Sequence, residues 1–314
     1  MEYVNDFLWK KGMSIKDLVK GYRNVGFQSI ELHKAKELIV KIKKNSAKTF
    51  LTFTSNMVTS GLRGFFAQLI KLKMAHVIVT TVGAIEEDIM KANNEKFPIG
   101  SFNADDVELH EQGVNRVGNL YITSESYMNF EDFMLPVLDK LYQKQKIWSV
   151  SGLLKEIGLT LNDESSILYQ AAKNNVPIFC PAITDGSFGF HLYLFQQKHK
   201  DFIVDVVKDF GNILFTTSHD EKKAVMSLGG GTSKHHAILS TLLNGGAEYA
   251  LFMTTAQKTS GSVGGATTSE AKSWGKVKDE ADVASVIGDV TIMFPLAMCA
   301  ALEELNGEGL LLIK

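Results

Sequence analysis

Residues 49–61 read TFLTFTSNMVTSG, an apolar and β-branched run that ends in small polar residues. A continuous apolar run of this length is typical of a strand that is covered on both faces, as in a parallel sheet. Comparable runs recur along the chain and alternate with segments of helical period. We therefore predict an α/β fold, with a largely parallel sheet and helices on both of its faces. The predicted strands are residues 49–54, 76–81, 177–180, 212–216, 224–228, 248–253 and 283–287.

Helices are predicted where apolar residues recur at i, i+3 and i+4. Ser14 is a candidate N-cap for the first of them, and Asp17 would complete a capping box with it. No change in composition marks a domain boundary, so we predict one large domain, residues 26–314, preceded by a helical segment, residues 1–25. The polar stretch 94–121 is interpreted as an insertion over the sheet edge. The predicted helices are residues 14–25, 60–73, 130–145, 164–174, 201–209, 235–243 and 289–305.

The composition is that of a folded globular chain. Of the 314 residues, 45% are hydrophobic and 22% are charged, which suffices for a substantial core. The formal charge of −2 lacks the basic excess of a general nucleic-acid binder. Cys180 and Cys299 cannot make a disulfide scaffold or a cysteine-based zinc site, and we expect both to be small buried hydrophobes. No run has the length of a membrane span or a signal sequence, so we expect a cytoplasmic protein.

Small polar residues follow most of the predicted strands. One such loop is ordinary helix capping, but six at the same end of a sheet favour a nucleotide-type ligand. Helix N-termini stabilise phosphate groups, and open parallel sheets bind ligands at the carboxyl ends of their strands. The usual Gly-x-Gly-x-x-Gly signature after the first strand is absent. The loops are residues 55–61, 80–88, 184–187, 229–236, 254–257 and 288–289.

Two of these loops carry groups that titrate. Glu86, Glu87 and Asp88 are predicted in the first turn of a helix, where acids either complement the helix dipole or face the cleft to bind ribose hydroxyls or a polycation. His235 and His236 follow three glycines at a predicted helix start. One of these imidazoles is a credible general base, because imidazole titrates near neutrality. The pair lacks the i, i+4 spacing of a helical zinc site, so we expect no metal.

A glycine-rich stretch, residues 259–270, leads into Trp274-Gly275-Lys276. Most lysines are solvated surface residues. Here Trp274 offers a large apolar wall two residues away, and Gly275 allows the backbone to approach closely. A lysine held in such a pocket can lose its proton and form imines, so Lys276 is a candidate nucleophile.

Taken together, these motifs resemble the deoxyhypusine synthase family over nearly the whole chain. The resemblance implies a Rossmann-like α/β domain that assembles as a homotetramer, with NAD and the active sites at a dimer interface. It also implies that an N-terminal helix can cap the active site of a neighbour. The motifs are residues 54–56 and 60–63, 86–88, 181–187, 229–231 with 234–236, 255–257, and 273–276.

The family resemblance implies a specific reaction. The aminobutyl group of the polyamine spermidine is transferred to one lysine of a translation-factor precursor, with NAD as the temporary hydride acceptor. The enzyme's own lysine, matched by Lys276, holds the aminobutyl group as an imine, and His235 matches the base at the amine. Glu86, Gly261, Ser262, Glu270 and Trp274 match substrate-site residues. The implied NAD contacts are Ser55, Asn56, Thr59, Thr81, Gly83, Glu87, Asp185, Gly230, Thr255, Ala256 and Asp289.

The chain departs from the family pattern around the amine. Phe190 replaces an aspartate, Leu239 replaces an asparagine, and Ser260 and Val263 replace acidic residues of the eukaryotic pattern. The loss of carboxylates should alter the affinity for the amine or the choice of amine. Two alternatives therefore stay open: transfer to a free diamine, as in homospermidine synthesis, or an altered NAD-binding paralogue that acts as a regulatory subunit. The presence of Lys276 argues against the latter.

Overall fold

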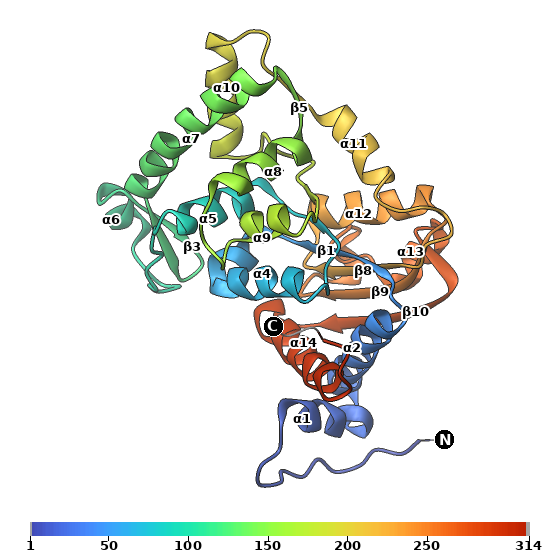
Figure 1. Ribbon diagram of the computed structural model, residues 1–314. Coiled ribbons are helices and arrows are strands. Elements are labelled where there is room, and N and C mark those ends of the chain that lie inside the picture. Colours follow the sequence, from blue (N-terminus) through green and yellow to red (C-terminus); the bar gives the residue numbers. More distant parts are fainter. Residues whose placement is uncertain (1, 312–314) are drawn as a thin grey trace. The chain divides into compact units, whose positions relative to one another are not determined.

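The computed structural model describes residues 2–311 (Figure 1). These residues form two compact units. The sheet unit comprises residues 2–53, 72–79 and 213–311, and the helical unit comprises residues 54–71 and 80–212. Each unit is assembled from separate stretches of the chain. Elements that are distant in sequence therefore supply the neighbours within each core.

Five parallel strands of the sheet unit lie side by side in the order β10-β9-β8-β1-β2. Nearly all residues of β1 and β8 are buried, as expected for strands that are covered on both faces. Helices α2 and α14 lie along one face, and α12 and α13 lie along the other (Figure 1). The predicted α/β fold with a parallel sheet is confirmed. The strands are β1 (Lys48–Phe53), β2 (Val77–Val79), β8 (Lys223–Leu228), β9 (Ala247–Thr254) and β10 (Val277–Ile287).

The N-terminal segment packs against the sheet unit through α1, which contacts α14 and α2. The predicted capping box is confirmed, because the Ser14 side chain accepts from Asp17 N and the Asp17 carboxylate accepts from Ser14 N. The extended residues before α1 are held by a hydrogen bond from Asn5 N to Asn24 O. The helices of this unit are α1 (Ile15–Gly21), η1 (Tyr22–Asn24), α2 (Phe27–Lys44), α12 (Gly231–Leu243), η3 (Lys258–Ser260), α13 (Thr268–Ser273) and α14 (Val290–Gly307).

The helical unit is organised around a buried carboxylate, Asp88. It accepts hydrogen bonds from Arg63 Nε at 2.5 Å and from Ser166 Oγ at 2.9 Å, so it joins α4, α5 and the start of α9. Buried charges require such partners. The elements are α3 (Ser55–Met57), η2 (Val58–Leu62), α4 (Arg63–Lys71), α5 (Val82–Ala92), α6 (Asp106–Glu111), β3 (Val114–Val117), β4 (Leu120–Thr123), α7 (Ser124–Lys144), β5 (Ile147–Ser149), α8 (Val150–Thr160), α9 (Ile167–Lys173), β6 (Ile178–Phe179), α10 (Ser187–Lys198), β7 (Ile203–Asp205) and α11 (Val206–Leu214).

Two predicted elements are wrong. Residues 212–214, predicted as the start of a strand, finish helix α11, and residues 203–205, predicted as helix, form strand β7 beside β5. A short apolar run does not distinguish a strand from a buried helical turn. Helix α2 and the β3–β4 hairpin were not predicted. Cys180 is fully buried as expected, whereas Cys299 is only partly buried.

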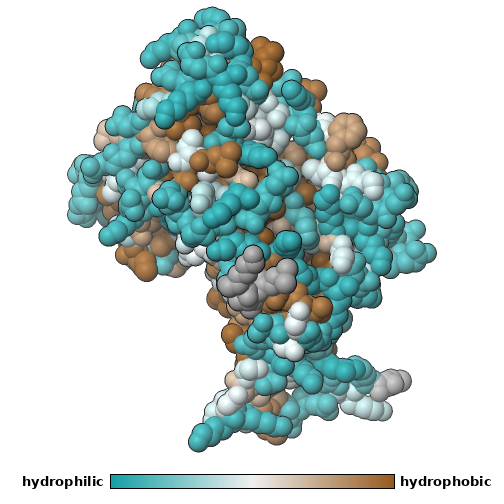
Figure 2. Space-filling view, in the orientation of Figure 1, coloured by the Kyte–Doolittle hydropathy of each residue, from teal (hydrophilic) through white to brown (hydrophobic). Residues whose placement is uncertain are grey.

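Hydrophilic residues cover most of the face in Figure 2. Within residues 2–311, no helix is both long enough and apolar enough to cross a membrane.

Candidate functional site

The predicted site residues fall into two groups, one in each unit. Those of the helical unit form what we call the acidic cluster: Ser55, Thr59, Thr81, Glu86 and Glu87. Those of the sheet unit surround what we call the basic cluster: Lys234, His235, His236 and Lys276. The acidic cluster follows strands β1 and β2, and Lys234, His235 and His236 follow β8, in each case near a helix start as the sequence predicted. Lys276 instead follows α13 and directly precedes β10.

In the acidic cluster, the loop after β1 is tied to the start of α5. Ser55 N donates a hydrogen bond to Thr81 Oγ1 at 3.0 Å, and Thr81 is the N-cap of α5. The approach is close because Gly83 lacks a side chain: a Cβ there would lie 3.0 Å from Ser55 Cβ. The neighbouring Asn56 accepts from Thr54 Oγ1 at 2.5 Å. These residues place polar groups at the N-terminus of α5, where backbone N–H groups can stabilise an anionic group.

Glu86 and Glu87 are buried side chains within α5, and the predicted first-turn position is wrong, because no acid lies in the first turn of this helix. Glu86 Oε1 accepts from Phe188 N at 2.6 Å, and Glu87 Oε2 accepts from Thr59 Oγ1 at 2.6 Å. The helix dipole therefore does not explain them.

Burial controls the protonation of both acids. It raises the pKa of Glu87 to about 7, against the hydrogen bond from Thr59 and the charge of Lys91, while nearby Glu86 adds to the rise. Burial also raises the pKa of Glu86, although N–H groups at the start of α10 oppose it. Desolvation disfavours the charged form of an acid. Glu87 is thus poised to exchange a proton near neutral pH.

The start of α10 packs tightly on Glu86. A Cβ at Gly186 would lie 2.6 Å from Glu86 Oε1 and 2.8 Å from Val82 Cγ1, so only glycine fits there. The preceding residue, Asp185, is exposed. The loop 184–187 therefore needs glycine at position 186, where the backbone packs on Glu86, and it exposes the carboxylate of Asp185.

In the sheet unit, the three glycines before α12 let a second loop approach. A Cβ at Gly230 would lie 2.3 Å from Gly264 Cα, and Gly231 has a φ of +74°, which favours glycine. The glycine-rich loop therefore lies directly against the start of α12. Nearby, Ala256 N donates to Thr254 Oγ1 at 3.0 Å, and Gly261 also has a positive φ, of +67°.

The glycine-rich loop leads into α13 and then to Lys276. Thr267 caps α13 by accepting from Glu270 N at 3.1 Å, and Ser262 Oγ accepts from Gly265 N at 3.3 Å. Lys276 Nζ lies 4.8 Å from the centre of the Trp274 ring. Trp274 itself is 64% exposed and Glu270 is also exposed, so the sheet unit alone does not enclose this lysine.

Burial lowers the pKa values of three bases of the basic cluster. Partial burial and the charge of Lys276 lower the pKa of His235, and burial lowers the pKa of His236 to about 4. Burial likewise lowers the pKa of Lys234 to about 8. Lys234 was not singled out from the sequence, because a lysine between two small residues and a histidine pair gives no signal of its burial. Two predicted residues of this unit remain: Thr255 is exposed directly after β9, and Asp289 caps α14 by accepting from Thr291 N at 2.8 Å.

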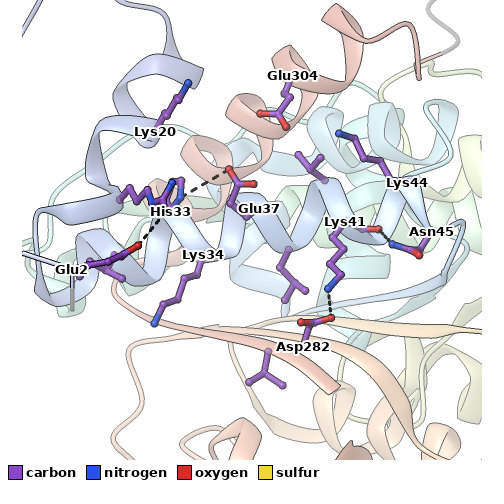
Figure 3. Close-up of a pocket in the computed structure, with 15 residues that line it drawn as sticks. Glu2, Lys20, His33, Lys34, Glu37, Lys41, Lys44, Asn45, Asp282 and Glu304 are labelled. Carbon is purple, nitrogen blue, oxygen red and sulfur yellow. Dashed lines mark hydrogen bonds and ion pairs between the residues drawn. The ribbon is translucent and has the colours of Figure 1, made fainter. Parts of the chain in front are cut away.

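A groove of about 730 Å³ lies elsewhere in the sheet unit, between α2, β10 and the N-terminal segment (Figure 3). It contains none of the predicted site residues. Its cations face anions: Arg23 pairs with Glu2 at 3.0 Å, and Lys41 pairs with Asp282 at 2.6 Å.

The family model for deoxyhypusine synthase matches residues 17–301. The chain belongs to the deoxyhypusine synthase family. It is 39% identical to a protein of Thermoplasma acidophilum described as a probable deoxyhypusine synthase, over 90% of this chain and 91% of that one. It is also 36% identical to the deoxyhypusine synthase of Candida glabrata, over 95% and 88% of the two chains. The chain is therefore a member of a family of transferases.

A structural comparison agrees with the family assignment. The crystal structure assigned as a deoxyhypusine synthase from Entamoeba histolytica matches with a TM-score of 0.66 and 28% identity, over 96% of each chain. The ternary complex of AgrE with ornithine and NAD+ matches with a TM-score of 0.54, over 89% of this chain and 34% of that one. At 10% identity, this second likeness concerns the fold alone.

The departures from the deoxyhypusine synthase pattern lie at accessible positions. Phe190 is 57% exposed on α10, and its ring centre lies 6.0 Å from that of His191. Leu239 and Val263 are partly buried and Ser260 is exposed. None of these side chains carries charge, so they cannot pair with an ammonium group.

Proposed function

We propose that this chain transfers the aminobutyl group of spermidine to a lysine of a translation-factor precursor, and that Lys276 holds the group as an imine between the two amines. The observation that carries the proposal is the position of Lys276, beside the indole of Trp274 and within electrostatic reach of His235. An amine with this surrounding can form an imine once it has lost its proton.

His235 is the proposed base. Its lowered pKa keeps the imidazole neutral near pH 7, so it can accept the proton that leaves the substrate amine. Once a hydride has also left the aminobutyl carbon for the proposed acceptor, the Lys276 nitrogen forms a C=N bond to this carbon. The bond from the carbon to the secondary amine nitrogen breaks, and the propylamine part of spermidine leaves as a diamine. The acceptor lysine takes the place of Lys276 in the imine, which frees Lys276 for another cycle. Glu86, Glu270, Gly261 and Ser262 are the proposed contacts of the polyamine.

NAD is the proposed cofactor, and when bound it supplies the hydride acceptor and returns the hydride at the end. Two features support this proposal: the N-termini of α5 and α12 lack a side-chain cap, which leaves N–H groups for a phosphate, and Glu87 offers a carboxylate for hydroxyl groups. An acid of this kind disfavours a 2′-phosphate. The other proposed contacts are Ser55, Asn56, Thr59, Thr81, Asp185, Thr255, Ala256 and Asp289.

The cofactor proposal predicts a difference between NAD and NADP. NAD should raise the melting temperature of the protein by mass action, and NADP should raise it much less. Equal stabilisation by the two would contradict the assignment.

The central experiment traps the imine. Borohydride is added to the protein with NAD and spermidine, and the peptides are analysed by mass spectrometry. The proposal expects one aminobutyl adduct, on Lys276. An adduct elsewhere, with Lys276 unmodified, would overturn the mechanism.

The acceptor is the least constrained part of the reaction. Phe190 removes a carboxylate from the amine site, and this observation favours a second candidate, transfer to a free diamine as in homospermidine synthesis. Product analysis with NAD, spermidine and either the precursor protein or putrescine separates the two. A modified precursor supports the first function, and homospermidine supports the second.

We further propose a homotetramer with its active sites at a dimer interface, in which residues 1–25 cap the site of a neighbour. The exposure of Trp274 and Glu270 supports this proposal, because imine chemistry requires a site from which water is excluded. Light scattering at micromolar concentration tests it, and a monomer would contradict it.

A further inference from the structure

Lys234 is completely buried, at 0% exposure, and lies on α12 directly before His235. Lysine is almost never fully buried without a partner of opposite charge. Here the ammonium donates a hydrogen bond to the Ala266 carbonyl at 2.8 Å and lies 4.0 Å from the centre of the Phe252 ring. Within residues 2–311 it forms no ion pair. Its strongest polar contact is therefore with the backbone of another segment.

That segment leads to the proposed nucleophile. Ala266 ends the glycine-rich loop, and the next residue, Thr267, caps α13. Helix α13 is followed by Lys276, whose carbonyl accepts from Ala247 N at 3.1 Å and lies 3.1 Å from Thr241 Oγ1, a hydroxyl that also lies 3.0 Å from Ile238 O. The carbonyls of Ala266 and Lys276 thus both bind side chains of α12.

The two donors on α12 belong to one face of the helix. Lys234 and Thr241 are seven residues apart, which is two helical turns. Both are fully buried, and α12 and α13 lie on the same side of the sheet (Figure 1). One face of α12 therefore contacts both ends of the segment 266–276, and strand β9 also binds the Lys276 end.

We propose that Lys234 is a positioning residue, whose ammonium clamps the Ala266 carbonyl and, together with Thr241, fixes the segment 266–276 that carries Lys276. A charged donor to a carbonyl is stronger than a neutral one, and the Phe252 ring offers the ammonium its electron-rich face. The contact between Lys234 and the Ala266 carbonyl does not depend on any role of Lys276. The functional part, that the clamp sets the position of a nucleophile, rests on the proposed role of Lys276.

The test uses the full-length protein without substrate or cofactor. Amide hydrogen exchange is measured for peptides that cover residues 262–276 in wild type and in Lys234→Met, which keeps much of the side-chain volume and removes the donor. The clamp predicts exchange about tenfold faster in this segment, with little change in peptides from α14.

Lys223→Met is the matched control. Lys223 is the other fully buried lysine of the sheet unit that binds loop carbonyls, with its Nζ 2.6 Å from Glu221 O and 3.2 Å from Ser218 O. General loss of stability would speed exchange across the molecule in both variants. Unchanged exchange of residues 262–276 in Lys234→Met, or equally faster exchange there in Lys223→Met, would overturn the clamp.

A second readout follows Lys276 itself. Butanal with cyanoborohydride alkylates accessible amines, and mass spectrometry gives the rate at Lys276 and its dependence on pH. We expect Lys234→Met to change this pH profile, and Lys223→Met to leave it as in wild type. An unchanged profile in Lys234→Met would overturn the positioning role. If wild type shows no adduct with spermidine and NAD, the proposed reaction fails, whereas the exchange result still decides the clamp.

Discussion

Burial shifts pKa values in the acidic cluster and in the basic cluster in opposite directions. In the helical unit, burial raises the pKa of Glu87 to about 7. In the sheet unit, burial lowers the pKa of Lys234 to about 8. Desolvation disfavours the charged form of any group. It therefore raises the pKa of an acid and lowers the pKa of a base. Burial therefore moves the pKa of one acid in the helical unit and of one lysine in the sheet unit closer to physiological pH.

The largest effect is expected from a substitution of Lys276, the proposed nucleophile of the basic cluster. Lys276→Arg keeps the charge but cannot form the imine. Transfer should fall by at least about 10³-fold, and the borohydride adduct should disappear. Lys272→Arg is the matched control, because Lys272 lies on α13 and its Nζ donates to Asp279 O at 2.5 Å. An active Lys276→Arg protein would refute the assignment of the nucleophile.

The lowered pKa of Lys234 predicts how the stability of the folded protein depends on pH. Above its folded pKa of about 8, the folded protein loses this proton while the unfolded lysine keeps it up to its ordinary value of 10.5. The free energy of unfolding of wild type, relative to Lys234→Met, should therefore rise with pH over this window, by up to about 1.4 kcal/mol per pH unit. Denaturant unfolding at a series of pH values measures it. A flat difference would show that the lysine is not desolvated.

Glu87 should behave with the opposite sign. Between its ordinary pKa of 4.5 and its folded pKa of about 7, the folded protein keeps a proton that the unfolded chain has lost. The stability of wild type relative to Glu87→Gln should therefore fall as the pH rises through this window. Gln keeps an acceptor for Thr59, which makes the variant a conservative reference. A difference that increases with pH would reverse the proposed cause.

The smallest expected effect is at Phe190, where the amine site departs from the family pattern. Phe190→Asp should lower the spermidine concentration for half-maximal NADH formation by about tenfold, because a carboxylate can pair with the ammonium. Phe190→Asn controls for size without the charge. If wild type already saturates at low concentration and Phe190→Asp weakens binding, other residues compensate for the missing aspartate.

Much of the fold follows from local patterns. The apolar runs of β1, β8 and β9 predicted strands within one residue of their observed bounds, since a strand covered on both faces has few other sequences available to it. The strand predicted at residues 212–216 failed because its pattern fits a helix end as well. Helix starts after the strands were predicted because capping is a local interaction.

The sequence alone determined the fold class, the family and the motifs that contain Glu86, His235 and Lys276, because these depend on short stretches of sequence and their order. Only the tertiary structure decided which side chains are desolvated. Glu87 is buried by Thr59 and its surroundings, and Lys234 by Phe252 and Ala266, which are distant in sequence. Desolvation depends on everything that packs around a group, and no local pattern encodes it.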